Sequence, residues 1–249
     1  MLVGDNLSIL LGQPINVTNV GNVYPIKLKD YSRFSMFAWT MEKTKASIDM
    51  QDSEEELLHL LILEDMKQED EDKRGMIIPC LIELIKMVTR EEVKFISETM
   101  SFIIGKSDSE DSSERFLNYS NFEEFRKVVA KQNLIVEKRY YKPLFQKMID
   151  DEKKRRASKG GLSLDTILSI LSVEMGVNYD FLAEMTYAQI ITNFKRIMLK
   201  ESYKTGIQFK ASGNYKDVII DNYTGEIDLY QHPDDEIYAK GKNPFSKLM

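Results

Sequence analysis

Residues that commonly anchor catalysis, metal binding or cross-links are scarce in this sequence. The 249 residues include one cysteine, Cys80, and two histidines, His59 and His232. A single cysteine excludes an internal disulfide and gives no reason to expect secretion. The two histidines lie too far apart in the sequence for the spacing of paired metal ligands, and no nucleophile signature surrounds Cys80. We therefore expect no catalytic residue, no metal site and no cofactor, and hence a protein that is not an enzyme.

Long apolar runs and an excess of positive charge are also missing. No run approaches the roughly 18 apolar residues that a membrane span requires. The first residues, MLVGDNLSILLGQ, lack the basic stretch and clear cleavage site of a signal peptide. The formal net charge of −6 gives no electrostatic reason to bind nucleic acid or an anionic membrane. We expect an intracellular protein whose partners are neither nucleic acids nor membranes.

Ordinary globular composition accompanies these absences, with 43% hydrophobic and 30% charged residues. Such a chain should fold, and its length allows one large domain or two smaller ones. Changes in residue pattern divide it into five segments. These are a lead-in with one or two short strands at 1–29, a helical segment at 30–105, an acidic Ser-rich loop or domain boundary at 106–115, a second helical segment at 116–200, and a β-hairpin with an extended tail at 201–249.

Capping patterns predict where several helices of the first half begin. Asp30 is expected to cap a helix whose buried face carries Phe34, Phe37, Ala38 and Met41. Three Ser/Thr-x-x-Glu patterns resemble capping boxes, in which two backbone N–H groups are satisfied reciprocally. They predict helix starts at Ser53 with Glu56, at Thr89 with Glu92, and at Ser120 with Glu123. Gly105 is expected to end the second of these helices.

The second half should be helical up to about residue 200. One helix is expected to start or break near Pro143, because proline suits the first turn of a helix. The stretch SLDTILSILSVEM predicts an amphipathic helix with Gly176 near its end. Its expected buried residues are Ile167, Leu168, Ile170 and Leu171. Further on, KDVIIDNYTGEIDLY predicts a β-hairpin. The expected fold is mainly α: a helical bundle-like body with short β elements at the N-terminus and a hairpin near the C-terminus.

Three charged or Gly-containing stretches admit a second interpretation. The sequence IIGKS at 103–107 ends like a phosphate-binding loop, but Met100 replaces the required glycine. The acidic run at 64–74 lacks the glycine order of a calcium loop and is expected to be a solvated helix end. The basic run within 150–161 follows acidic residues and is expected to be a charged helix end leading to a linker.

The most organised stretch is FLAEMTYAQIITNFKRI at 181–197. Thr186 and Gln189 form a T-x-x-Q capping box, and Met185 and Ile190 stand where a hydrophobic staple would place them. A helix should therefore begin at Tyr187. A short helical turn is expected before it, capped by Asn178 or Asp180.

An apolar stripe continues along this predicted helix. It comprises Ile190, Ile191, Phe194, Ile197 and Met198, which share one helical face and are expected to be core. The cations Lys195, Arg196 and Lys200 are expected near its C-terminal end, where positive charge suits the helix dipole.

Two regions, 23–40 and 116–200, resemble a known protein family. The quoted stretches are VYPIKLKDYSRFSMFA, NFEEFRKVVAKQNLIVEKRYYKPLFQKMIDDEKKRR and GLSLDTILSILSVEMGVNYDFLAEMTYAQIITNFKRI. They resemble tail-assembly chaperones and related baseplate-hub assembly proteins of tailed bacteriophages. The matching residues are Met185, Thr186, Tyr187, Gln189 and Arg196.

The resemblance implies a non-enzymatic assembly chaperone in the host cytoplasm. Its expected partner is another tail component, such as the tape measure protein or a baseplate hub protein. The alternative is a structural tail or baseplate subunit that stays in the virion. The partner-binding residues and the state of self-association are left open by the sequence.

Overall fold

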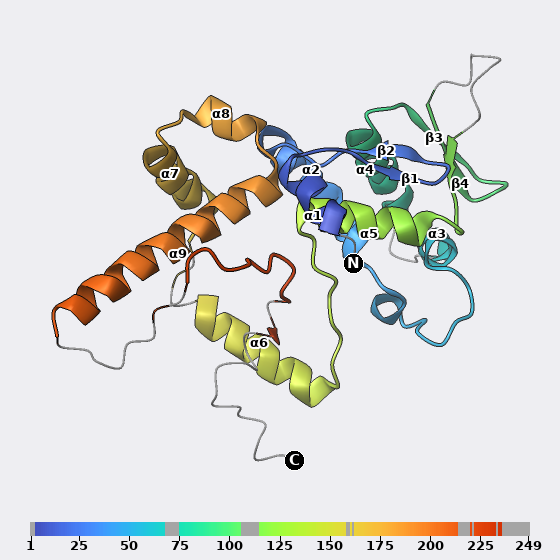
Figure 1. The fold of residues 1–249 in the computed structure, drawn as a ribbon. Helices are drawn as coiled ribbons and strands as arrows, with labels where there is room; N and C mark the ends of the chain where they lie inside the picture. Colours follow the sequence, from blue (N-terminus) through green and yellow to red (C-terminus); the bar gives the residue numbers. More distant parts are fainter. Residues whose placement is uncertain are drawn as a thin grey trace. The chain divides into compact units, whose positions relative to one another are not determined.

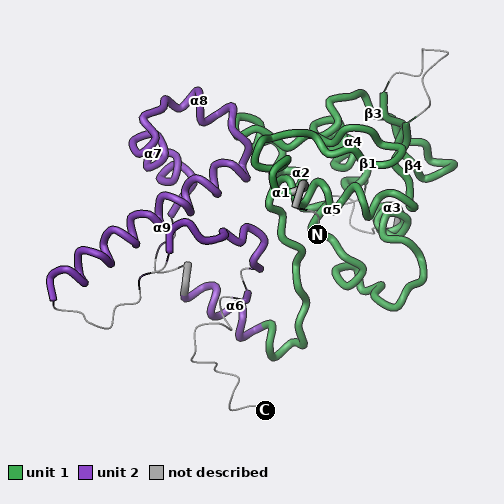
Figure 2. The backbone as a smooth tube through the Cα atoms, in the orientation of Figure 1, with its two compact units in different colours: residues 1–146 green, residues 147–249 purple. Residues whose placement is uncertain are grey.

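The computed structural model describes residues 3–67, 75–105, 115–157, 160, 162–213, 220, 222–232 and 234–235. The chain divides into two compact units, residues 1–146 and 147–249 (Figure 2). About 58% of the structure is helical, and the remaining regular structure consists of two small antiparallel sheets in the described part of the chain. The expected mainly α fold is therefore confirmed.

The first unit combines helices with both sheets (Figure 1). Its elements are α1 (Val3–Leu10), β1 (Ile15–Val17), β2 (Gly21–Val23), α2 (Leu28–Glu42), the short 3₁₀ helix η1 (Lys45–Ile48), α3 (Leu57–Lys67), α4 (Ile77–Thr89), β3 (Val93–Ile96), β4 (Ser101–Ile104), β5 (Arg115–Leu117) and α5 (Phe122–Asn133). The N-terminal strands expected within residues 1–29 are present as the β1–β2 pair. The irregular lead-in before them contains a helix, α1.

The core of the first unit is built around α4. Leu81, Leu84, Ile85 and Val88 of this helix are fully buried. The other large buried side chains of this core come from neighbouring elements and include Phe34, Met41, Leu58, Leu61, Ile62, Phe102, Phe122 and Phe125. The predicted face of α2 is confirmed, because Phe34 and Met41 are buried and Phe37 and Ala38 pack against the core.

A β-hairpin occupies the region where a helix was expected to start at Thr89. The Thr89 hydroxyl donates to the carbonyl of Ile85 at 2.7 Å, and Arg90 adopts a left-handed conformation with φ 61°. Thr89 therefore ends α4. The following residues alternate between the two faces of a sheet, and β3 pairs with β4 in the register Val93↔Ile104. β-branched and aromatic side chains at alternate positions fit a pleated surface better than a helix.

Gly105 ends β4 rather than a helix. Its φ of +97° suits glycine, and a Cβ placed on it would lie 2.8 Å from Nη2 of Arg115. The Arg115 guanidinium also pairs with Glu91 at 3.1 Å. β4 and β5 belong to one sheet, so the predicted loop at 106–115 connects two paired strands, and the compact units divide instead at 146/147. Residues 106–114, with the Lys and Ser of IIGKS, lie outside the described residues.

The helix starts predicted from the capping boxes at Ser53 and Ser120 are also wrong. The Ser53 hydroxyl accepts from the backbone N–H of Glu55, and α3 begins only at Leu57. α5 begins at Phe122 with Asn121 at its N-cap, one residue later than expected from Ser120. Similarly, α2 begins at Leu28, so Asp30 lies in its first turn. Ser and Thr serve short turns as readily as helix starts, which makes this pattern ambiguous.

The second unit is built from helices. They are α6 (Pro143–Ala157), which crosses the division between the units, α7 (Leu164–Met175), α8 (Tyr179–Glu184) and α9 (Tyr187–Ala211). The starts at Pro143 and Tyr187 and the end of α7 at Gly176 are confirmed. The helix α7 is more exposed than expected. Of its four predicted core residues only Leu171 is buried, whereas Ile167, Leu168 and Ile170 are half-buried.

The hairpin expected near the C-terminus is not confirmed. Residues 216–219 and 221, which would form its first strand, lie outside the described residues. Residues 222–232 are described and contain no strand. We call the described residues 220, 222–232 and 234–235 the C-terminal strap.

Candidate protein-binding surface

The predicted capping box at the start of α9 is present. The Gln189 N–H donates to Oγ1 of Thr186 at 3.2 Å, and the Thr186 N–H donates to Oε1 of Gln189 at 2.8 Å. Of the two residues considered as the cap of the preceding turn, Asn178 and Asp180, it is Asn178 that caps α8, because its side chain accepts from the N–H of Phe181 at 2.9 Å. The Asn178 cap fixes where α8 begins, and the Thr186–Gln189 box fixes where α9 begins.

The apolar stripe of α9 is buried only at its N-terminal end. Ile190 is fully buried, while Ile191, Phe194 and Ile197 are half-buried and Met198 is 46% exposed. The structure therefore corrects the prediction that the whole stripe is core. Part of this helix is a surface, although its start is anchored in the second unit.

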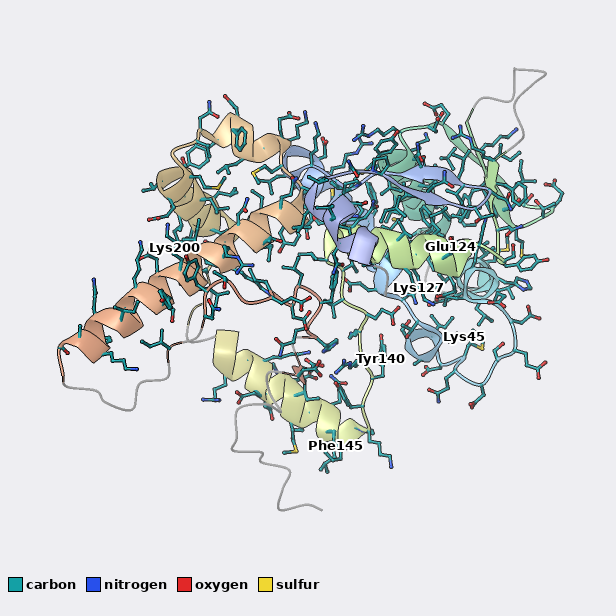
Figure 3. All side chains as sticks on the ribbon, viewed as in Figure 1. Lys45, Glu124, Lys127, Tyr140, Phe145 and Lys200 are labelled. Carbon is teal, nitrogen blue, oxygen red and sulfur yellow. The ribbon has the colours of Figure 1, made fainter. Side chains whose placement is uncertain are left out.

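The cations expected near the C-terminal end of α9 lie in its middle, because the helix continues to Ala211. Lys200 is exposed on the helix surface (Figure 3). Lys195 and Arg196 have specific acceptors instead. Lys195 Nζ donates to the carbonyl of Asp228 at 3.0 Å. Their role is thus contact with the main chain of the C-terminal strap, and compensation of the helix dipole does not account for it.

Arg196 is the main polar link between α9 and the C-terminal strap. Its Nη1 donates to the carbonyl of Tyr223 and, at 2.9 Å, to the carbonyl of Gly225. These two acceptors lie in a turn that Asn222 stabilises by accepting from the N–H of Thr224 at 3.0 Å. The guanidinium therefore holds a preformed turn, with a planar fork of donors that suits two adjacent carbonyls.

Two apolar contacts continue the same face toward the end of α9. The rings of Tyr203 and Tyr223 lie with their centroids 5.1 Å apart and their planes at 53°. Further along, a Cβ on Gly206 would lie 3.3 Å from Cγ1 of Ile220, so the absence of a side chain lets Ile220 approach the helix. In Figure 1 the strap runs beside α9 and then turns toward α6. Sequence reasoning missed Tyr203, Gly206 and Tyr223, since no local pattern links positions this far apart.

The far end of the C-terminal strap meets α6. Lys153 Nζ pairs with Oδ1 of Asp234 at 2.8 Å, and the Asp234 carboxylate is buried. The Asp234 N–H donates to Nδ1 of His232 at 3.1 Å, and His232 is buried as well. The strap is therefore attached at both ends, to α9 and to α6.

Large apolar side chains are exposed on the helices of the second unit. Val173 of α7 is 77% exposed, and Tyr179 and Phe181 of α8 are 58% and 52% exposed. The others on described helices of this unit are Met175, Met198, Ile207 and Phe209. Single exposed apolar residues are common on proteins, but several such side chains on adjoining helices are typical of a surface that contacts another protein.

Three residues considered for chemistry, His59, Cys80 and Asp65, lie in the first unit. His59 pairs with Glu55 at 2.6 Å. Cys80 is half-buried in α4, and burial raises the pKa of its thiol. Asp65, from the acidic run, is buried and accepts from the N–H groups of Ile77 and Ile78 at 3.0 and 3.2 Å, which caps α4. The described residues contain no group of three or more His, Cys, Asp or Glu that could hold a metal ion.

Comparison with known proteins points to a phage-derived relative. A family model described as the YomV second domain matches residues 152–228, which cover α7 to α9 and most of the C-terminal strap. The SPbeta prophage-derived uncharacterized protein YomV of Bacillus subtilis (strain 168) is 24% identical over 243 residues, covering 96% of this chain and 95% of that protein. No solved structure matches. Among the helices that the structure describes, none is long and apolar enough to cross a membrane.

Proposed function

We propose that this chain is a phage protein that acts by binding another phage protein during virion assembly. The similarity to a prophage-derived protein along almost the whole of both chains supports a phage-related role. The resemblance of residues 116–200 to tail-assembly chaperones and baseplate-hub assembly proteins supports the narrower role of an assembly chaperone. The expected partner is a tail component such as the tape measure protein or a hub protein.

The observation that carries the binding role is the exposed apolar surface of the second unit. Val173, Tyr179 and Phe181 present more than half of their accessible surface to solvent. Burial of one such side chain against a partner contributes about 1.5–3 kcal/mol before the cost of association is subtracted. An amphipathic helix of a tail protein is a suitable partner, since its apolar face would cover these side chains until the tail assembles.

The first experiment separates a chaperone from a structural subunit. Quantitative mass spectrometry would compare this chain in a lysate of phage-producing cells and in purified particles. A chaperone should be abundant in the lysate, co-purify with one tail protein and be absent from the particles. Presence in particles at a fixed ratio to the tail proteins would contradict the chaperone role and favour the alternative, a structural tail or baseplate subunit.

A further inference from the structure

The C-terminal strap contacts α9 in two ways, through its main-chain carbonyls and through apolar side chains. All the hydrogen bonds described above from Lys195 and Arg196 end on main-chain carbonyls of the strap, at Tyr223, Gly225 and Asp228. Among the described residues, the ring of Tyr223 and the side chain of Ile220 add contacts that depend on the residue type. Donors that bind carbonyls select a backbone shape, so the side-chain requirements of this face of α9 come from its contacts with the Tyr223 ring and the Ile220 side chain.

The positions on α9 form a continuous row. Lys195, Tyr203 and Gly206 lie eight and three residues apart, and Arg196 lies beside the first of them. Such spacings place side chains on one face of a helix, one or two turns from each other. The strap follows this row in the opposite chain direction, with Ile220 at Gly206, Tyr223 at Tyr203 and Asp228 at Lys195.

The attachment of the C-terminal strap to this row is weak. Thr224, Gly225, Glu226 and Asp228 are exposed, and Tyr223 is only half-buried. An exposed hydrogen bond adds little net stability, because water competes for both of its partners. The strap has its buried residues further on, at His232 and Asp234 near α6. The part on α9 can therefore leave the helix while the α6 attachment remains.

We propose that this row of α9 is a peptide-binding surface that the C-terminal strap occupies until a partner segment replaces it. The row consists of Lys195, Arg196, Tyr203 and Gly206. The segment that replaces the strap has a turn with two carbonyls directed at Arg196, an aromatic ring against Tyr203, and a branched apolar side chain at Gly206. This rests on the proposed function, since the partner segment would belong to the tail protein that the chain binds.

The test uses the full chain and a synthetic peptide of residues 220–232 as the probe. The double variant Ile220→Ala with Tyr223→Ala removes both strap side chains that contact α9 and leaves the row itself unchanged. The measurement is the nuclear magnetic resonance signal of the Arg196 Nε–H group, with millimolar peptide added. The signal should shift in the double variant and return toward its wild-type position when the peptide is added. The wild-type chain, whose row is already occupied, should show little change at the same peptide concentration.

Two controls keep the result interpretable. Glu226→Gln changes an exposed residue of the strap and should leave the Arg196 signal at its wild-type position. A peptide with alanine at the positions of Ile220 and Tyr223 should not restore the signal in the double variant. The proposal is overturned if the double variant keeps its helical circular dichroism and the unmodified peptide leaves the Arg196 signal unmoved. Because no phage partner is present, this outcome would leave the assembly role itself unaffected.

Discussion

The Tyr203 ring of α9 lies against the Tyr223 ring of the C-terminal strap, with a centroid distance of 5.1 Å and an interplanar angle of 53°. This tilted arrangement is one that aromatic pairs favour, and it adds roughly 0.5–1.5 kcal/mol beyond the area that the rings bury. The pair joins segments twenty residues apart in the sequence and places an aromatic contact beside the Arg196 hydrogen bonds. Loss of either ring should therefore loosen the strap without removing the start of α9.

The capping box at the start of α9 gives the first prediction. Thr186→Ala removes the hydroxyl that accepts from the Gln189 N–H, and should cost about 1 kcal/mol in the free energy of unfolding. Thr186→Ser keeps the hydroxyl and should lose much less. Urea denaturation followed by circular dichroism measures both. An unchanged midpoint for Thr186→Ala would show that the second unit does not depend on this cap.

Arg126 gives a prediction for the core of the first unit. This buried side chain donates to the carbonyl of Met41 at 2.9 Å and to Glu137 at 2.6 Å. Arg126→Ala leaves a buried carbonyl unsatisfied and removes packing, so the free energy of unfolding should fall by about 2–3 kcal/mol.

The control for Arg126 is a surface ion pair of similar length. Arg33 pairs with Glu83 at 2.7 Å, but its side chain is 65% exposed. Arg33→Ala should therefore change the free energy of unfolding by less than about 1 kcal/mol. Equal losses for the two variants in the same denaturation experiment would contradict the buried role of Arg126.

Because Gly105 and Arg115 are in close contact, substitutions at the two positions should have non-additive effects on the free energy of unfolding. Gly105→Ala forces a positive φ on alanine and pushes the Arg115 guanidinium away from Glu91, so it should cost about 2 kcal/mol. Gly75→Ala, at φ +71° with open space around the new methyl group, should cost about 1 kcal/mol from the backbone alone. In an Arg115→Ala background the two glycine changes should cost about the same amount. A larger cost for Gly105→Ala that persists in this background would show that Arg115 is not its cause.

The thiol of Cys80 should react more slowly in the folded chain than in the unfolded chain, and its protonation should make stability depend on pH. Desolvation by burial raises the pKa of the Cys80 thiol, and the nearby Asp65 carboxylate acts in the same direction, although a hydrogen bond with Trp39 partly opposes them. Less thiolate is then present at pH 8 than in an exposed cysteine, so iodoacetamide should label Cys80 more slowly in the folded chain than in urea. Since the folded state holds the proton more tightly, stability should be complete below the pKa of the unfolded thiol and decline above it. Equal labelling rates in the folded and unfolded chain would contradict a desolvated thiol.

The parts of the fold that could be predicted depend on residues close together in the sequence. Thr186 with Gln189, Asn178 before α8 and Gly176 after α7 act within four residues, and each has the predicted role. The same kind of pattern failed at Thr89, because a threonine near a helix end can bond back to the preceding turn as well as start a new helix. The alternation in VKFI and SFII was the better signal there, and it indicates a β-hairpin.

The parts of the candidate surface that could not be predicted involve contacts between distant segments. Arg196 was singled out by the family resemblance, but its acceptors are the main-chain carbonyls of Tyr223 and Gly225, which every residue type possesses. A sequence pattern cannot reveal such partners. The exposure of Val173 and Phe181 could not be predicted either. An apolar residue on a helix is usually expected to be buried, and only the positions of the neighbouring elements show that it is not.

The exposed apolar side chains of the second unit are the proposed binding surface for a tail protein. The most direct measurement is affinity capture from phage-producing cells with tagged full-length variants, followed by quantitative mass spectrometry. The change Val173→Asp with Phe181→Asp should reduce the captured tail protein at least tenfold, since about 1.4 kcal/mol of lost binding energy is enough for that factor. Met36 of α2, in the first unit, is 66% exposed. Met36→Asp is therefore the matched control and should capture as much tail protein as the wild type. Equal capture by all three chains, with helical content unchanged, would contradict the account.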